Sequence, residues 1–258
     1  MKRPIILVVN DDGISAKGIR SLIEVVKPFG DILVVAPDGP RSGMSHAITM
    51  HVPLRVKKVA EYENVTEYIT NGTPVDCVKL AHKVILKGYP DLVVSGINHG
   101  ANTAISLLYS GTMAAALEAA FENVPSIGFS LLSYDADADF SAAKEIAREI
   151  IKRTLSQDIP TRGCLNINIP YIPLDKIKGT RITRQAKGFW KEDLVPYHDP
   201  HGHEYYWLTG EFHNEDDGID TDVWAVENQY VSIQPVQFDL TDHQRTDAYQ
   251  FLSNIELT

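Results

Sequence analysis

The sequence lacks three features that mark large classes of proteins: a basic excess, a cysteine framework and a long apolar run. It carries 24 lysines and arginines against 34 acidic residues, a net charge of −10. That balance argues against sequence-independent binding to duplex nucleic acid, which needs a basic surface. Its two cysteines, Cys77 and Cys164, stand isolated in apolar surroundings, typical of buried thiols in a reducing compartment. No apolar stretch approaches the roughly 18 residues of a membrane span, so we expect a cytoplasmic protein with no membrane partner.

Apolar runs alternate with helical patterns through the first two-thirds of the chain. The runs predict buried strands at residues 5–9, 32–36 and 92–94, and strands at 126–130 and 165–169 complete the pattern. Apolar residues at helical spacing and helix-start signals predict helices at residues 19–29, 74–86, 113–121 and 140–155. Shorter strands are predicted at residues 47–50, 54–59 and 67–70. Such alternation predicts an α/β fold, a Rossmann-like doubly wound sheet that is mostly parallel.

The pattern changes after Pro170. Strands are predicted at 178–187 and 230–235, while the segment between them is rich in His, Asp, Tyr, Trp and Gly. We therefore divide the chain into a Rossmann-like catalytic core, residues 1–175, and a β-rich C-terminal extension, residues 176–258. An acidic, aromatic hairpin arm is hard to bury on its own. We expect this extension to pack on a partner subunit and to serve oligomerisation.

Two adjacent carboxylates, Asp11 and Asp12, follow the first predicted strand directly. They would lie where the strand's carboxyl end opens into a loop, the edge at which open α/β sheets bind ligands. Neighbouring carboxylates repel unless a cation lies between them or one stays protonated. The pair therefore indicates a site for a hard metal ion. The alternative is an ordinary turn in which an aspartate caps the following helix.

Oxygen-bearing side chains also follow two other predicted strands. Ser42 lies in the small-residue loop after the second strand, and Asn98 follows the strand at 92–94. If these loops converge, two carboxylates, a hydroxyl and an amide oxygen face one point. That set suits Mg²⁺, Mn²⁺ or Ca²⁺ better than zinc, because it holds neither sulfur nor histidine.

The segment Ser110-Gly111-Thr112 precedes an alanine-rich helix. Free backbone N–H groups at a helix start and two hydroxyls favour an anion such as phosphate. Helix capping by Ser110 or Thr112 is the simpler alternative. A cation and a phosphate site on one edge indicate metal-assisted hydrolysis of a phosphoester, in which Asp11 or Asp12 ligates the metal or accepts a proton from water.

Several histidines have open roles. His46 and His99 flank the proposed ligands, and either can contact phosphate or protonate a leaving alkoxide; an exposed loop histidine is the alternative. The spacing of the three histidines in the extension fits no closed structural zinc site, which favours a polar arm tip. These residues are His198, His201 and His203.

An ordered set of motifs resembles the SurE family, the survival-protein nucleotidases. The matching segments are Asn10-Asp11-Asp12-Gly13-Ile14, Arg41-Ser42-Gly43, Ser95-Gly96-Ile97-Asn98 with Gly100 and Asn102, Tyr109-Ser110-Gly111-Thr112, and Tyr230-Val231-Ser232-Ile233-Gln234-Pro235. Within this match, Gln234 stands where the family commonly has threonine. The departure lies in the C-terminal extension, outside the proposed metal ligands.

The resemblance implies a phosphohydrolase that depends on one divalent metal per subunit and releases phosphate from nucleoside 5′-monophosphates. It also implies some action on 3′-nucleotides and short polyphosphate, and homodimers or homotetramers. The metal ligands it implies are Asp11, Asp12, Ser42 and Asn98. The phosphate contacts expected are Gly43, His46, Asn102, Ser110, Gly111 and Thr112.

Two other functions use acidic residues after a first strand. A receiver-like signalling module needs a phosphate-accepting aspartate at the end of a central strand, where this chain has Ser95-Gly96. A phosphatase that forms an aspartyl-phosphate spaces two aspartates by one residue, whereas Asp11 and Asp12 are adjacent. A dinucleotide enzyme is disfavoured, since no glycine fingerprint follows the first strand.

Overall fold

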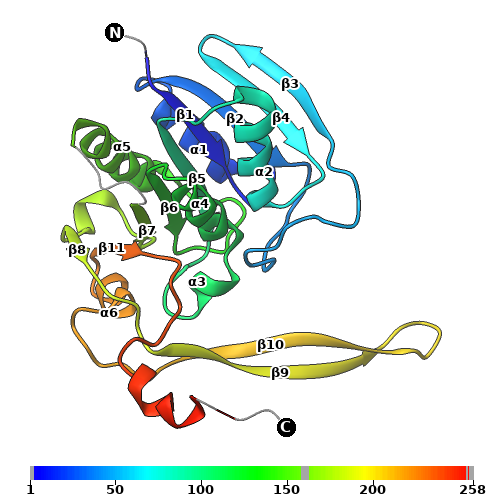
Figure 1. Cartoon of the computed structure of the whole chain (residues 1–258), viewed down its shortest axis with the longest axis vertical. Coiled ribbons are helices and arrows are strands. Elements are labelled where there is room, and N and C mark those ends of the chain that lie inside the picture. The colour runs from blue at the N-terminus through cyan, green and yellow to red at the C-terminus, as the bar shows by residue number, and fades with distance from the viewer. Residues whose placement is uncertain (1–2, 158–162, 254, 256–258) are drawn as a thin grey trace.

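The computed structural model describes residues 3–157, 163–253 and 255. Its main sheet contains nine strands: β1 (Ile5–Val9), β2 (Asp31–Pro37), β3 (Val56–Tyr62), β4 (Val65–Thr70), β5 (Leu92–His99), β6 (Ser126–Leu131), β7 (Cys164–Ile169), β8 (Thr180–Ile182) and β11 (Val231–Val236). Their order is β3-β4-β2-β1-β5-β6-β7-β11-β8 (Figure 1). Only β3–β4 and β7–β11 pair antiparallel among these described strands. The predicted α/β class with a mostly parallel sheet is confirmed.

Helices cover both faces of this sheet. Alternate residues of β1 point to opposite sides, so Ile6 and Val8 pack in one apolar cluster while Leu7 and Val9 pack in another. The first cluster contains residues of α1 (Lys17–Val26) and α5 (Ser141–Ser156). The second contains residues of α2 (Pro74–Leu80) and α4 (Gly111–Phe121). Burial on both faces explains why the central strands read as continuous apolar runs.

One predicted strand is absent and several predicted elements differ in extent. Residues 47–50 are irregular because a side chain, not a neighbouring strand, satisfies their backbone: the Asp76 carboxylate accepts from the Thr49 N–H at 3.2 Å. The predicted helix at 74–86 is α-helical only to Leu80 and continues as the π-helix η1 (Ala81–Leu86). The strand predicted at 92–94 extends to His99, which brings Asn98 into β5 itself.

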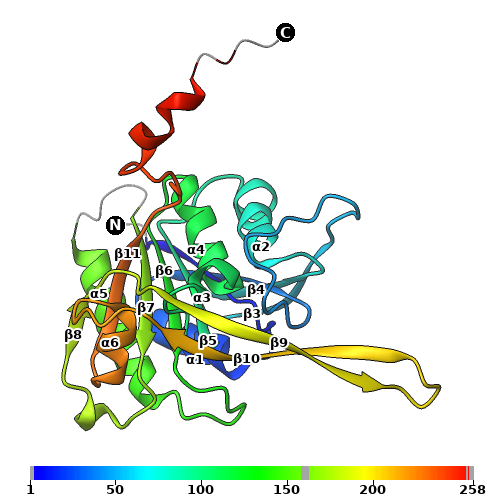
Figure 2. The same cartoon turned by 90° about the horizontal axis from the view of Figure 1, so that it is seen from below.

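The C-terminal extension contributes to the main sheet and also projects from it. Strands β8 and β11 join the sheet edge, and only the first part of the strand predicted at 178–187 forms. Between them lie a two-stranded hairpin, β9 (Gly188–His198) with β10 (Glu204–Asn214), and the short helix α6 (Asp222–Glu227). Figure 2 shows the hairpin extending as a long arm, with the 3₁₀ helix η3 (Thr246–Leu252) standing apart from the body. Across the described residues, no helix is both long and apolar enough to cross a membrane.

Candidate metal and phosphate site

The acidic pair lies at the point where the order of the sheet reverses. The chain moves outward from β1 through β2 to β4 on one side, and from β5 through β6 to β7 on the other. Strands β1 and β5 are parallel neighbours, with Val9 opposite Ser95. Asp11 and Asp12 follow β1 and Asn98 lies near the end of β5, so all three share the sheet edge at which open α/β folds bind ligands.

Asp11 is a buried carboxylate that faces the start of α4. Its side chain is 4% exposed, and Thr112 Oγ1 donates a hydrogen bond to Asp11 Oδ1 at 2.5 Å. A Cβ atom on Gly111 would stand 2.8 Å from Asp11 Cβ, so the helix start fits against Asp11 only because residue 111 has no side chain. Burial, and then the charge of Asp12, raise the pKa of Asp11 to about 6, although the Thr112 bond opposes the rise.

Asp12 carries a polar atom that nothing in the described chain satisfies. Burial raises the pKa of this carboxyl, and a backbone hydrogen bond from His99 opposes that rise. Its Oδ2 atom is buried and has no hydrogen-bond partner among the described residues. Asn10 fixes the turn itself, because its Nδ2 donates to the Gly13 carbonyl at 2.9 Å. Two adjacent carboxylates with an unsatisfied buried oxygen are the environment that a bound cation stabilises.

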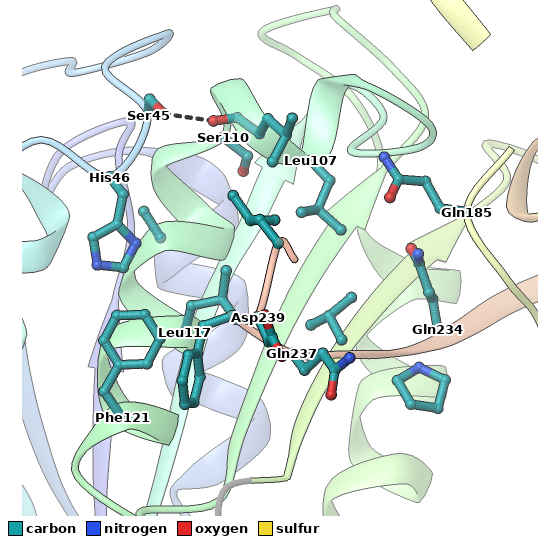
Figure 3. Close-up of a pocket in the computed structure, with 16 residues that line it drawn as sticks. Ser45, His46, Leu107, Ser110, Leu117, Phe121, Gln185, Gln234, Gln237 and Asp239 are labelled. Atoms are coloured by element: carbon teal, nitrogen blue, oxygen red, sulfur yellow. Dashed lines mark hydrogen bonds between the residues drawn. The ribbon is translucent and has the colours of Figure 1, made fainter. Parts of the chain in front are cut away.

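The loop that contains Ser42 is tied to this centre on both sides. The Arg41 N–H donates to the Asp11 carbonyl at 2.7 Å. Ser42 is therefore the neighbour in sequence of a residue that is bonded to the acidic turn. Ser45 attaches the far side of the loop, since its N–H donates to the Tyr109 carbonyl at 3.1 Å and its hydroxyl to the Leu108 carbonyl at 2.5 Å (Figure 3). Ser42 is exposed at the surface. Gly43 has a φ of 71°, a left-handed conformation that glycine adopts without strain.

Asn98 is half-buried, and its side-chain nitrogen already has a partner. Its Nδ2 donates to the Gly100 carbonyl at 3.0 Å. The amide oxygen, which is the metal-ligating atom of an asparagine, therefore remains for another partner. The acidic turn, the Ser42 loop, the end of β5 and the start of α4 thus meet around Asp11 and Asp12.

Some of the expected phosphate contacts have internal partners. Ser110 caps α4, with its Oγ accepting from the Met113 N–H at 3.0 Å. Asn102 donates through Nδ2 to Ser130 Oγ at 2.8 Å. The Nε2 atom of His46 lies 3.0 Å from Glu118 Oε2, and the His46 ring stacks on Phe121, as Figure 3 shows. Each of these side chains therefore already has a partner within the chain. Phosphate binding by Ser110, Asn102 and His46 stays a prediction.

A cavity of about 490 Å³ lies between α4 and the end of β11 with the segment that follows it (Figure 3). Ser110 and His46 line its wall, but Asp11 and Asp12 do not.

The three histidines near the hairpin tip form no metal site: no group of three or more His, Cys, Asp or Glu side chains in the described residues is placed to hold an ion. The acidic pair contributes only two such side chains, so the predicted metal site at this edge depends on further oxygen ligands, for which Ser42 and Asn98 remain the prediction.

Comparison with known proteins gives the family. The family model described as "Survival protein SurE" matches residues 6–192. The chain belongs to the SurE family. The 5′-nucleotidase SurE of Flavobacterium psychrophilum is 53% identical over 258 residues, all of this chain and 99% of the relative. That of Flavobacterium johnsoniae is 52% identical over 243 residues, 94% of each chain.

The fold agrees with this assignment. The crystal structure of SurE protein from Aquifex aeolicus superposes with a TM-score of 0.82 at 39% identity, covering 96% of this chain and 99% of that one. The resemblance inferred from the ordered motifs is thereby confirmed. Membership of SurE also favours a phosphohydrolase over a receiver-like module.

Sequence reasoning missed two features of the site: the hydrogen bond from Thr112 to Asp11, and the asparagines Asn166 and Asn168 behind the Asn102 loop. The alternating asparagines in an otherwise apolar strand were the available signal.

Proposed function

We propose that the edge of the sheet at Asp11 and Asp12 is the catalytic centre of a metal-dependent 5′-nucleotidase. The chain is a nucleotidase of the SurE family, which is similar over its full length to relatives named 5′-nucleotidase SurE. The observation that carries the placement is the buried acidic pair with its unsatisfied Asp12 Oδ2. The proposed ligands of one divalent cation, Mg²⁺ or Mn²⁺ with Ca²⁺ as a substitute, are Asp11, Asp12, Ser42 and Asn98.

When bound, the cation neutralises phosphoryl charge and lowers the pKa of water. The chain supplies the geometry. Thr112 holds Asp11 at a fixed orientation, and the Arg41 N–H fixes the backbone of the Ser42 loop on the Asp11 carbonyl. In this proposal, either Asp11 or Asp12 ligates the metal or accepts the proton of the attacking water. The positive end of α4 attracts the phosphate, with Gly111 and Thr112 as first contacts and Gly43, His46, Asn102 and Ser110 around them.

The proposed substrates are nucleoside 5′-monophosphates, with 3′-nucleotides and short polyphosphate as further ones. The proposed location is the cytoplasm, where both buried cysteines would stay reduced. We also propose a homodimer or homotetramer built through the C-terminal extension. Its hairpin exposes large apolar side chains, including Trp207 at 60% and Leu208 at 62%, that a monomer leaves in water.

A phosphate-release screen tests this function. The purified protein is assayed against mono-, di- and polyphosphate substrates with EDTA, Mg²⁺, Mn²⁺ or Ca²⁺. We expect release from nucleoside 5′-monophosphates that EDTA abolishes and Mg²⁺ or Mn²⁺ restores. Asp11→Asn should be inactive, whereas Asp175→Asn, which changes an exposed carboxylate outside the cluster, should match the parent. Full activity of Asp11→Asn would refute the site, and a phosphorylated Asp11 or Asp12 after acid quench would favour a covalent mechanism.

A further inference from the structure

Three amide side chains form a buried polar seam behind the proposed metal site. Asn166 and Asn168 lie two residues apart on β7 and share one face of the sheet. Gln234, directly opposite Asn166 on β11, joins them. Asn166 and Asn168 are fully buried, and Gln234 is 4% exposed. Buried amides destabilise a strand unless each is hydrogen-bonded, so apolar residues would suit these positions better for stability alone.

The seam holds the backbone of Asn102 through both of its polar groups. Asn168 Oδ1 accepts from the Asn102 N–H at 2.8 Å, and Asn166 Nδ2 donates to the Asn102 carbonyl at 2.8 Å. The amides also order one another: Asn168 Nδ2 donates to Asn166 Oδ1 at 3.1 Å, and Asn166 Nδ2 donates to Gln234 Oε1 at 3.0 Å. The orientation of each amide is therefore set by its neighbour.

The loop held in this way leads directly to Asn98. The Gly100 N–H donates to the Leu131 carbonyl at 2.9 Å, so the loop is attached to β6 as well. The Gly100 carbonyl accepts from Asn98 Nδ2, and this bond decides which end of the Asn98 amide is left for a cation. A continuous path therefore connects the C-terminal strand β11 with a proposed metal ligand. Hydrogen bonds lead from Gln234 through Asn166 to the Asn102 carbonyl, and the backbone leads from there to Gly100. The Gly100 carbonyl then accepts from Asn98.

We propose that Asn166, Asn168 and Gln234 are positioning residues that hold the segment after β5, residues 100–102, so that Asn98 near the end of β5 presents its amide oxygen to the catalytic cation. The inference rests on the proposed ligation of the metal by Asn98. It assigns to the C-terminal extension, through Gln234, a part in the active site that does not depend on a partner subunit. Groups that orient metal ligands in this way typically change metal affinity or activity by about 10- to 100-fold when removed.

The test compares seam variants with a matched control on the same strand. Asn168→Ala removes the acceptor of the Asn102 N–H. Gln234→Leu removes the acceptor on β11 of the Asn166 Nδ2 hydrogen bond. The control is Ser232→Ala: Ser232 is fully buried on β11 opposite Asn168, but among the described residues its hydroxyl bonds Thr183, at 2.8 Å, and neither the seam amides nor Asn102. Mn²⁺ binding to the full chain without substrate is measured by electron paramagnetic resonance, and kcat and KM for a nucleoside monophosphate are measured alongside.

We expect Asn168→Ala to weaken Mn²⁺ binding by about 10-fold or more and Gln234→Leu by less, while Ser232→Ala binds Mn²⁺ like the parent even where its melting temperature falls. Where Asn168→Ala fails to fold, Gln234→Leu, which removes the acceptor of an Asn166 Nδ2 hydrogen bond, carries the test in its place. Parent-like Mn²⁺ affinity in folded Asn168→Ala, or in Gln234→Leu where Asn168→Ala does not fold, overturns the inference.

Asn98→Ala separates this inference from the proposed site. If Asn98→Ala weakens Mn²⁺ binding and the seam variants do not, the positioning role fails and the ligand set stands. If Asn98→Ala leaves Mn²⁺ affinity unchanged, the ligand set is wrong, and the positioning role fails with it.

Discussion

Replacing Asp11 by asparagine should stabilise the metal-free protein near neutral pH while it abolishes activity. The folded chain holds the pKa of Asp11 at about 6, above the ordinary 3.8. Raising the pH through this interval therefore ionises Asp11 more readily in the unfolded chain and destabilises the folded state. Asparagine carries no charge to bury, yet it keeps an oxygen that accepts from Thr112 Oγ1.

The size of this stability difference follows from the pKa of Asp11 in the unfolded and in the folded chain. The gap between 3.8 and about 6 corresponds to about 3 kcal/mol of unfolding free energy at about 1.4 kcal/mol per pH unit. Below pH 3.8, the unfolding free energy of Asp11→Asn should equal that of the parent. The advantage of Asp11→Asn in unfolding free energy should grow up to pH 6 and stay constant above it. Urea unfolding in EDTA between pH 4.5 and 8, with Asp175→Asn as control, measures this difference.

Added Mn²⁺ should reverse the order of stability. A ligand that binds only the folded state stabilises it by mass action, and the parent retains the charge that binds the cation. Mn²⁺ should therefore raise the melting temperature of the parent and leave Asp11→Asn almost unchanged. A stability difference independent of pH, or an Asp11→Asn variant less stable than the parent at pH 8 without metal, would refute the reasoning.

Three further changes test other parts of the structure. Gly111→Ala should lower kcat by more than about 10-fold with little loss of secondary structure, because its Cβ would displace Asp11; circular dichroism and phosphate release check this. Asp222→Ala should lower the unfolding free energy by about 3 kcal/mol in urea titrations, since the buried carboxylate accepts from three backbone N–H groups. Trp207→Glu should shift the proposed homodimer or homotetramer towards monomer in light scattering; an unchanged mass would exclude the arm from the proposed interface.

The central strands and covering helices could be predicted because burial on two faces leaves a direct record in the sequence. The apolar runs at β1 and β2 are short and typical of buried strands, and the alternation with helices limits the topology to few choices. The same logic placed Asp11, Asp12 and Asn98 at one edge, since the carboxyl ends of parallel strands meet there. The family motifs then gave the activity that the comparisons support.

The features that escaped prediction depend on contacts between distant segments. Residues 47–50 look like a strand, but the Asp76 side chain satisfies the Thr49 backbone, and no local pattern records that contact. The orientation of a side chain is equally non-local: Thr112 turns to Asp11, and His46 turns to Glu118 on α4. Short helices such as α6, of six residues, are too brief to show periodicity.

Anomalous X-ray scattering from crystals grown with Mn²⁺ tests the central claim most directly. The account predicts one manganese peak per subunit, at the carboxyl ends of β1 and β5. It should lie about 2.0–2.4 Å from oxygens of Asp11, Asp12, Ser42 and Asn98. A peak bound by other residues, or no peak at this edge in crystals of an enzyme that Mn²⁺ activates, would contradict the account.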